Sequence, residues 1–139
     1  MALAADALKE QPLFASLSGK ERELIAGSMD ELTFAPGSAL ITQGTSNDRF
    51  FVLTYGEADV NVDERLRQTL KPGAFFGEIS MQRGVPATAT VVARTELRAY
   101  VMTREQFGAL SKSPGVLPHL QAAIGDRLAH DRLVSSWHQ

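Results

Sequence analysis

The spacing of apolar residues changes twice along the chain, and the changes divide it into three parts. In residues 1–29 apolar residues recur every three or four positions, as they do on one face of a helix. In 30–102 they form short runs, often alternating or β-branched, which is typical of strands. In 103–139 the helical spacing returns. A chain of 139 residues commonly forms one domain, so we expect a single domain with helices on both sides of a β-rich middle.

The helical parts carry clear start signals. Ser18 is followed three residues later by Glu21, and Thr103 by Gln106, and each pair predicts a capping box. A short helix is also expected within residues 2–10. The helix after Ser18 is expected to have an apolar face of Leu24, Ile25 and Met29. After Thr103 we expect Phe107 and Leu110 to face inward. The last helix is expected to begin at about Val116 and to carry an apolar stripe of Leu117, Leu120, Ile124 and Leu128.

The β-rich middle consists of short runs separated by turns. Seven runs have strand character: "ELTF", "SALIT", "FFVLTY", "ADVNV", "LRQTL", "TATVVA" and "LRAYVM". The turns between them are marked by Pro36-Gly37, Gly44, Gly56 and Pro72-Gly73. Short strands at this spacing predict an antiparallel sandwich or roll. We expect a mainly β fold, an eight-stranded antiparallel β-roll of the jelly-roll kind, with a helical turn inserted near 77–83 and core positions for Phe50, Phe51, Phe75 and Phe76.

Composition excludes several classes of function. Lys and Arg together number 14 against 16 Asp and Glu, with no basic run, so we expect no nucleic-acid partner. The absence of cysteine excludes disulfides, thiolate catalysis and zinc–thiolate sites. No apolar stretch approaches the roughly 20 residues of a membrane span, and the start "MALAADALKEQ" lacks the basic region of a signal peptide. We therefore expect a cytoplasmic protein that does not insert into membranes.

Enzymatic chemistry finds little support in the sequence. A nucleophile elbow and a P-loop are both missing from it. A β-roll can also belong to a metal-dependent, cupin-like enzyme. However, the three histidines, His119, His130 and His138, all fall in the last helical part and none in a strand. We expect no enzyme and no metal, and keep the cupin-like enzyme as a hypothesis that a metal analysis would test.

The stretch "FFGEISMQRGVPATATVVA", residues 75–93, carries the candidate chemistry. Its glycines, turn proline and small residues allow a backbone to approach a ligand closely. A carboxylate can hold a polyol there, and a turn rich in N–H groups can hold an anion. Together with "FAPGSALITQG" (34–44), "FFVLTYGEADV" (50–60) and "LKPGAFFGEIS" (70–80), this stretch resembles the cyclic nucleotide-binding domains, and the resemblance covers nearly all of the chain.

The resemblance implies a phosphate-binding cassette at residues 75–90, with a short helix of its own. In that family the glutamate of the Gly-Glu pair accepts hydrogen bonds from the ribose 2′-hydroxyl, a role that maps to Glu78. Backbone N–H groups at the N-terminus of the short helix point at the cyclic phosphate. This role maps to the backbone around Gly77 and Ile79. The implied ligand is cyclic AMP or cyclic GMP.

The chain departs from the family pattern at one position of the cassette. In the family an arginine directly follows the proline and pairs with the phosphate, but here Pro86 is followed by Ala87. The spacing from the glutamate to the proline is the family's own. Thr88 can offer a hydroxyl to the phosphate or be an ordinary strand residue, and Ala89 completes the candidate site. Arg83 is a possible substitute cation, although a solvated surface arginine is the commoner case.

The resemblance also implies how such a module works. Ligand binding tightens the cassette, and the C-terminal helices reorient and signal to a protein partner or a second copy of the chain. Trp137 is a candidate lid over the base, or else a packing or interface residue. We expect a non-catalytic regulatory module with weakened or altered cyclic nucleotide binding. The alternative is a degenerate domain that binds no cyclic nucleotide and acts as a docking or scaffold module.

Overall fold

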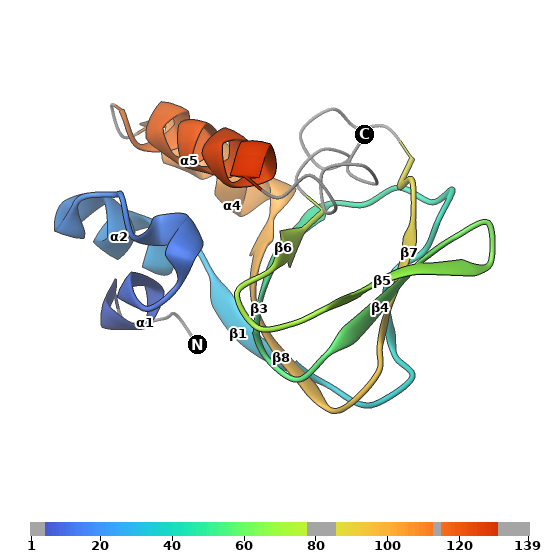
Figure 1. Ribbon diagram of the computed structural model, residues 1–139. Coiled ribbons are helices and arrows are strands. Elements are labelled where there is room, and N and C mark those ends of the chain that lie inside the picture. Colours follow the sequence, from blue (N-terminus) through green and yellow to red (C-terminus); the bar gives the residue numbers. More distant parts are fainter. Residues whose placement is uncertain (1–4, 78–85, 113–114, 131–139) are drawn as a thin grey trace.

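The computed structural model describes residues 5–77, 86–112 and 115–130 (Figure 1). Its helices lie together beside a β-roll (Figure 1). The helices are α1 (Ala5–Lys9), the 3₁₀ helix η1 (Pro12–Phe14), α2 (Gly19–Ala26), α4 (Arg104–Ala109), the 3₁₀ helix η2 (Leu110–Lys112) and α5 (Val116–His130). The strands are β1 (Asp30–Phe34), β2 (Ala39–Ile41), β3 (Arg49–Tyr55), β4 (Ala58–Val62), β5 (Arg65–Leu70), β6 (Phe75–Phe76), β7 (Thr90–Ala93) and β8 (Leu97–Thr103).

The eight strands form two four-stranded sheets in which all pairs are antiparallel. The first sheet has the order β1-β8-β3-β6 and the second β2-β7-β4-β5. This arrangement confirms the predicted antiparallel β-roll. All seven predicted runs form strands, and the eighth strand, β6, is a pair of phenylalanines that the turn signals around it had hidden.

The core has two parts, one on each face of the first sheet. Phe50 and Phe75 pack against the helices, and their ring centroids lie 6.1 Å apart. Their sequence neighbours Phe51 and Phe76 point the other way, between the two sheets, and their rings stack at 4.8 Å. Successive side chains of a strand point to opposite faces, so a doublet of phenylalanines can fill both parts of the core. The predicted core positions of all four residues are confirmed.

The helices begin where the capping signals predicted. The side-chain oxygen of Ser18 accepts from the backbone N–H of Glu21, and that of Thr103 accepts from Gln106, with the reciprocal bond present in both boxes. The predicted apolar face of α2 needs two corrections. Leu24 is 37% exposed, and Met29, although fully buried like Ile25, lies beyond the end of the helix at Ala26. The buried face of α2 is centred on Ile25, which leaves Leu24 at its border.

The C-terminal helices also pack as expected. Phe107 and Leu110 are buried, and α5 begins at Val116 as predicted. The buried positions that the structure describes on α5 are Val116, Leu120 and Ala123. The side chains of Leu117, Ile124 and Leu128 and the expected helical turn near 77–83 lie outside the described part. Among the helices that the structure describes, none is long and apolar enough to cross a membrane.

Candidate functional site

The chain crosses twice from one sheet to the other at the same end of the roll. The first crossing, residues 42–48, leads from β2 in the second sheet to β3 in the first. The second, residues 77–89, leads from β6 in the first sheet back to β7 in the second. The second crossing contains the Gly-Glu pair and the proline that sequence analysis singled out. We call residues 44–49 the frame loop, because they hold both ends of this second crossing.

The proline end of the second crossing is held by backbone pairing. Pro86 forms a β-bridge with Ser46 of the frame loop. The N–H of Ala87 donates to the carbonyl of Thr45 at 2.9 Å, and the N–H of Gly44 donates to the carbonyl of Ala87, also at 2.9 Å. Backbone contacts alone therefore hold this end of the cassette in place. Differences in ligand preference can come only from side chains outside these contacts.

The glycine end is held by a buried asparagine. Asn47 is 6% exposed and is the one buried polar residue among those the structure describes. Its Nδ2 donates to the carbonyls of Arg49 at 2.8 Å and Gly77 at 3.0 Å, and its Oδ1 accepts from the N–H of Arg49 at 3.2 Å. Buried polar groups are costly unless bonded, so these contacts fix Asn47 and through it the carbonyl before Glu78.

Gly77 is required at its position for two reasons. Its φ of +92° is in the region that favours glycine, and a Cβ there would lie 2.5 Å from the carbonyl oxygen of Arg49. It would also lie 3.0 Å from Nδ2 of Asn47. The close approach of the two crossings is thus possible only without a side chain at position 77.

Of the remaining predicted site residues, some lie in the part of the chain that the structure describes and some lie outside it. Ala87 and Ala89 are buried in the core between the sheets, and Thr88 is exposed between them. The side chain that replaces the family's arginine therefore faces the interior of the roll. The other candidates, Glu78, Ile79, Arg83 and Trp137, lie outside the described residues.

Two arginines stand at this end of the roll. The guanidinium of Arg104, the first residue of α4, donates to the carbonyl of Asn47 at 3.2 Å, and its N–H donates to the carbonyl of Asp48 at 2.7 Å. Arg49, the first residue of β3, lies with its guanidinium carbon 5.2 Å from the centroid of the Phe51 ring. Sequence analysis missed Asn47 and Arg49, because a polar run between strands, "TSNDR", gives no sign of which members become buried.

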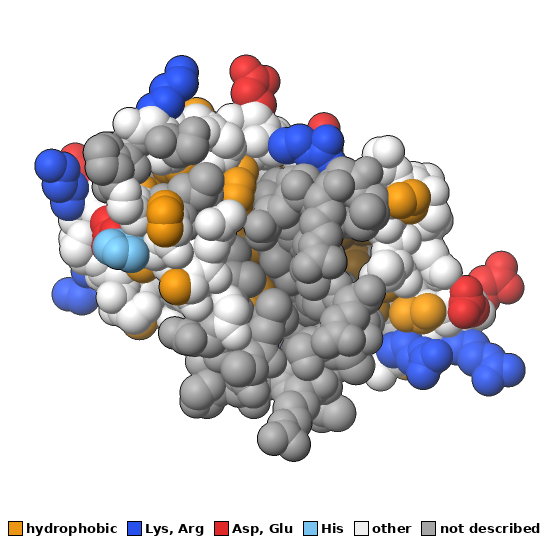
Figure 2. Space-filling view, turned by 90° about the horizontal axis from the view of Figure 1, so that it is seen from above, with side chains coloured by type: hydrophobic (Ala, Val, Ile, Leu, Met, Phe, Trp, Pro, Cys, Tyr) orange, Lys and Arg blue, Asp and Glu red, His pale blue; other side chains and the backbone are white. Residues whose placement is uncertain are grey.

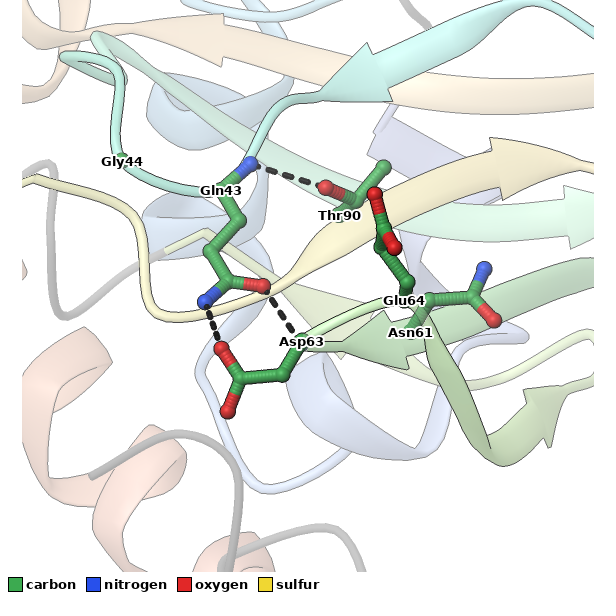
Figure 3. Close-up of a pocket in the computed structure, with 6 residues that line it drawn as sticks. All are labelled: Gln43, Gly44, Asn61, Asp63, Glu64 and Thr90. Carbon is green, nitrogen blue, oxygen red and sulfur yellow. Dashed lines mark hydrogen bonds between the residues drawn. The ribbon is translucent and has the colours of Figure 1, made fainter.

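A pocket of about 730 Å³ lies behind the frame loop, beside the β4–β5 turn. Figure 3 shows the amide of Gln43 facing Asp63: its Nε2 donates to Oδ1 of Asp63 at 2.9 Å, and its Oε1 accepts from the Asp63 N–H at 2.8 Å. The N–H of Gln43 donates to the hydroxyl of Thr90 at 2.9 Å (Figure 3). These bonds brace the start of the frame loop against β7 and the turn.

A second pocket of about 590 Å³ lies between α2 and α5. Here Nδ1 of His119 contacts the carboxylate of Glu21. Hydrogen bonding to the backbone N–H of Ser18, and then to His119, lowers the pKa of Glu21. His119 therefore contacts the glutamate of the capping box that begins α2. Among the described residues no group of three His, Asp or Glu is placed to hold a metal.

On the face shown in Figure 2, most of the described lysines and arginines are dispersed, and several lie beside acidic side chains, while two blue side chains adjoin at the lower right edge. This part of the surface offers no continuous basic track of the kind that binds nucleic acid.

Comparisons with known proteins agree with this geometry. Residues 31–113, more than half of the chain, match the family model described as "Cyclic nucleotide-binding domain". The chain is 34% identical over 116 residues to a cAMP-dependent protein kinase regulatory subunit of Yarrowia lipolytica, covering 82% of this chain and 30% of the relative. The chain thus spans about a third of that relative's length.

Two solved structures extend the comparison. The N-terminal domain of a transcriptional regulator from Streptomyces coelicolor A3(2) superposes with a TM-score of 0.75 at 30% identity, over 90% of this chain and 94% of that one. A regulatory subunit of a cAMP-independent protein kinase A from Trypanosoma brucei shares the fold, with a TM-score of 0.79 at 20% identity, over 94% and 46% of the two chains. From the match of the family model and the 34% identity to the Yarrowia subunit, the chain belongs to the cyclic nucleotide-binding domain family.

Proposed function

We propose that the chain is a regulatory module that binds a cyclic nucleotide, cyclic AMP or cyclic GMP, and performs no catalysis of its own. The observation that carries the proposal is the frame loop. It holds Gly77 on one side and Pro86 and Ala87 on the other, so the ends of the family's cassette are fixed in place. A site whose backbone is fixed before the ligand arrives loses less conformational entropy on binding.

The ligand-contacting roles are assigned to the cassette. In the proposal Glu78 accepts the ribose 2′-hydroxyl, and the N–H groups around Gly77 and Ile79 meet the phosphate, with Thr88 beside them. Ala87 offers no cation. A hydrogen bond to a charged group contributes about 1.5–3 kcal/mol, so losing the family's arginine costs about ten- to a hundredfold in affinity unless another cation replaces it. Binding is therefore weakened or altered.

The output of the module passes through the C-terminal helices. Arg104 begins α4 and is bonded to the frame loop through both its N–H and its guanidinium. A ligand that shifts the cassette therefore also shifts the support of α4, and α5 follows it in the chain. The receiving surface is proposed to be a protein partner or a second copy of the chain.

A second candidate function is a docking or scaffold module that no longer binds a cyclic nucleotide. The observation that favours it is Ala87, whose small apolar side chain is 6% exposed where the family has its phosphate-binding arginine. The same fold occurs in a regulatory subunit from Trypanosoma brucei whose kinase is described as cAMP-independent.

A double-mutant cycle between protein and ligand tests the proposal. Glu78→Gln keeps the shape of the side chain but removes its charge, and a 2′-deoxy cyclic nucleotide removes the hydroxyl. We expect each single change to cost about 1–2 kcal/mol of binding free energy and the double change little more. Additive losses would mean that Glu78 does not contact the ribose. No binding by the unmodified chain would favour the docking module.

A further inference from the structure

Arg49 lies on the inner side of the roll, at the end that carries the crossings 42–48 and 77–89. Side chains two apart on a strand share a face, and Phe51 is fully buried between the sheets. The guanidinium carbon of Arg49 is 5.2 Å from the centroid of that ring, which places it over the inner face of β3. The side chain is half-buried, so its charge is partly removed from water.

The two ends of the cassette, Gly77 and Ala87, lie at the same end of the roll as Arg49. The carbonyl of Arg49 lies against Gly77, where an added Cβ would approach it to 2.5 Å. The same Cβ would lie 3.3 Å from the side chain of Ile41. Ile41 and Ala87 belong to the same part of the core, between the sheets, as Phe51. Arg49, the first residue of β3, and Ala87, three residues before β7, therefore border the same part of the core.

Among the residues that the structure describes, no carboxylate pairs with Arg49. Within the described part of the chain, its guanidinium has the Phe51 ring as its contact and no hydrogen-bond acceptor or acidic partner. Other arginines are engaged: Arg94 lies 3.7 Å from a carboxylate oxygen of Asp59, and Arg104 donates to the frame loop. A partly desolvated cation over an aromatic face is only partly stabilised, and an anion would complete its surroundings.

We propose that Arg49 binds the phosphate of the ligand and so supplies, from β3, the positive charge that Ala87 does not. The inference deepens the proposed function and rests on it. In this proposal the chain still binds a cyclic nucleotide, but the phosphate is held by a residue of the first sheet rather than by one of the cassette. Arg49 replaces Arg83 as the preferred substitute cation, because its position is fixed by a strand.

Arg98 offers a matched control. Its guanidinium carbon also lies 5.2 Å from a ring centroid, that of Tyr55, which is at the other end of β3 and 55% exposed. We expect Arg49→Gln to weaken binding of cyclic AMP and cyclic GMP about ten- to a hundredfold, and Arg98→Gln to leave it unchanged. Arg49→Lys keeps the charge and should lose less than Arg49→Gln. The full chain is used throughout, with thermal unfolding measured for each variant.

Complementation distinguishes a phosphate contact from a merely structural role. In the Arg49→Gln background, Ala87→Arg should restore most of the lost affinity, because a positive charge returns to the same end of the core from the cassette. If the Arg49→Gln variant binds the cyclic nucleotide as tightly as the unmodified chain does, the inference is overturned and the proposed function stays intact. A loss of affinity with Arg83→Gln instead would assign the role to Arg83. An unmodified chain that binds neither nucleotide would overturn both.

Discussion

The two sheets of the roll bury their side chains in different ways. β3 of the first sheet is buried at four consecutive positions, from Phe50 to Leu53, because helices cover one face and the second sheet covers the other. β7 of the second sheet alternates, with Val91 and Ala93 buried and Thr90 and Val92 half-buried. β3 is therefore covered on both faces, whereas β7 has one solvated face.

This difference explains where a ligand site can be built. A polar side chain in the middle of β3 would have no water on either side, so near this strand polar chemistry is confined to the ends of the roll, one of which carries the crossings 42–48 and 77–89. Asn47 and Arg49 stand at that end, one bonded to backbone and the other placed over an aromatic ring.

The largest effect is expected in the core between the sheets. Phe76→Ala removes a fully buried ring that stacks on Phe51, and it should lower the free energy of unfolding by about 3–5 kcal/mol. Val92→Ala, on the solvated face of the second sheet, should cost about 1 kcal/mol or less. Chemical denaturation of both variants measures the contrast. Equal losses would mean that the two sheets do not differ as described.

The next effect separates two glycines that share a backbone conformation. Gly73 and Gly77 both have positive φ, at +99° and +92°, but an added Cβ meets nothing within 4 Å at Gly73 and a carbonyl at 2.5 Å at Gly77. We expect Gly73→Ala to cost about 1 kcal/mol of stability and Gly77→Ala about 3 kcal/mol, because only the latter forces the two crossings apart. Similar costs in thermal unfolding would show that the crossings are not in close contact.

A smaller effect is expected from the asparagine of the frame loop. Asn47→Ala leaves the carbonyls of Gly77 and Arg49 without their donor, which should cost about 1–3 kcal/mol of stability. Asn61→Ala, on β4, should be nearly neutral. Hydrogen exchange should also quicken at the amides of Arg49 and Arg104, which are bonded to the frame loop. Unchanged exchange at both amides would contradict the role given to Asn47.

The smallest effect concerns the contact between α2 and α5. The folded state lowers the pKa of Glu21 below its usual value of 4.5, so its ionised form stabilises the fold above that pH. This stabilisation should be lost as the pH falls through the lowered pKa. Glu21→Gln should reduce the slope of stability against pH in the acid range, and Glu23→Gln, on the exposed side of the same helix, should not. Parallel curves for all three proteins would exclude this contribution.

The sequence was sufficient for the elements that local chemistry determines. Alternation and turn glycines located seven strands, and Ser18 and Thr103 located two helix starts, because these signals lie within a few residues of one another. Leu24 was misplaced because helical spacing alone does not decide which side of an apolar stripe meets the core. The phenylalanine doublets were expected to be buried, but only the layering of the sheets explains why neighbours serve different parts of the core.

The site was partly predictable for the same reason. The resemblance marked Gly77 and Pro86 to Ala89 as the ends of a cassette, and the structure shows that both ends are held by one loop. Asn47 could not be found from the sequence, because its role arises from the bond to Gly77, 30 positions away. Arg49 was missed because nothing in a polar run shows which side chain lies over the ring of Phe51. Whether a polar residue in a turn is solvated or buried is decided by tertiary structure.

The most direct test of the central claim is a calorimetric titration of the unmodified chain with cyclic AMP and, separately, with cyclic GMP. We expect saturable binding of at least one of them at a single site, weakened by Arg49→Gln and unaffected by Arg98→Gln. Absence of saturable binding for both nucleotides would contradict the claim that the framed cassette is a working cyclic nucleotide site, and the docking module would become the better description of this chain.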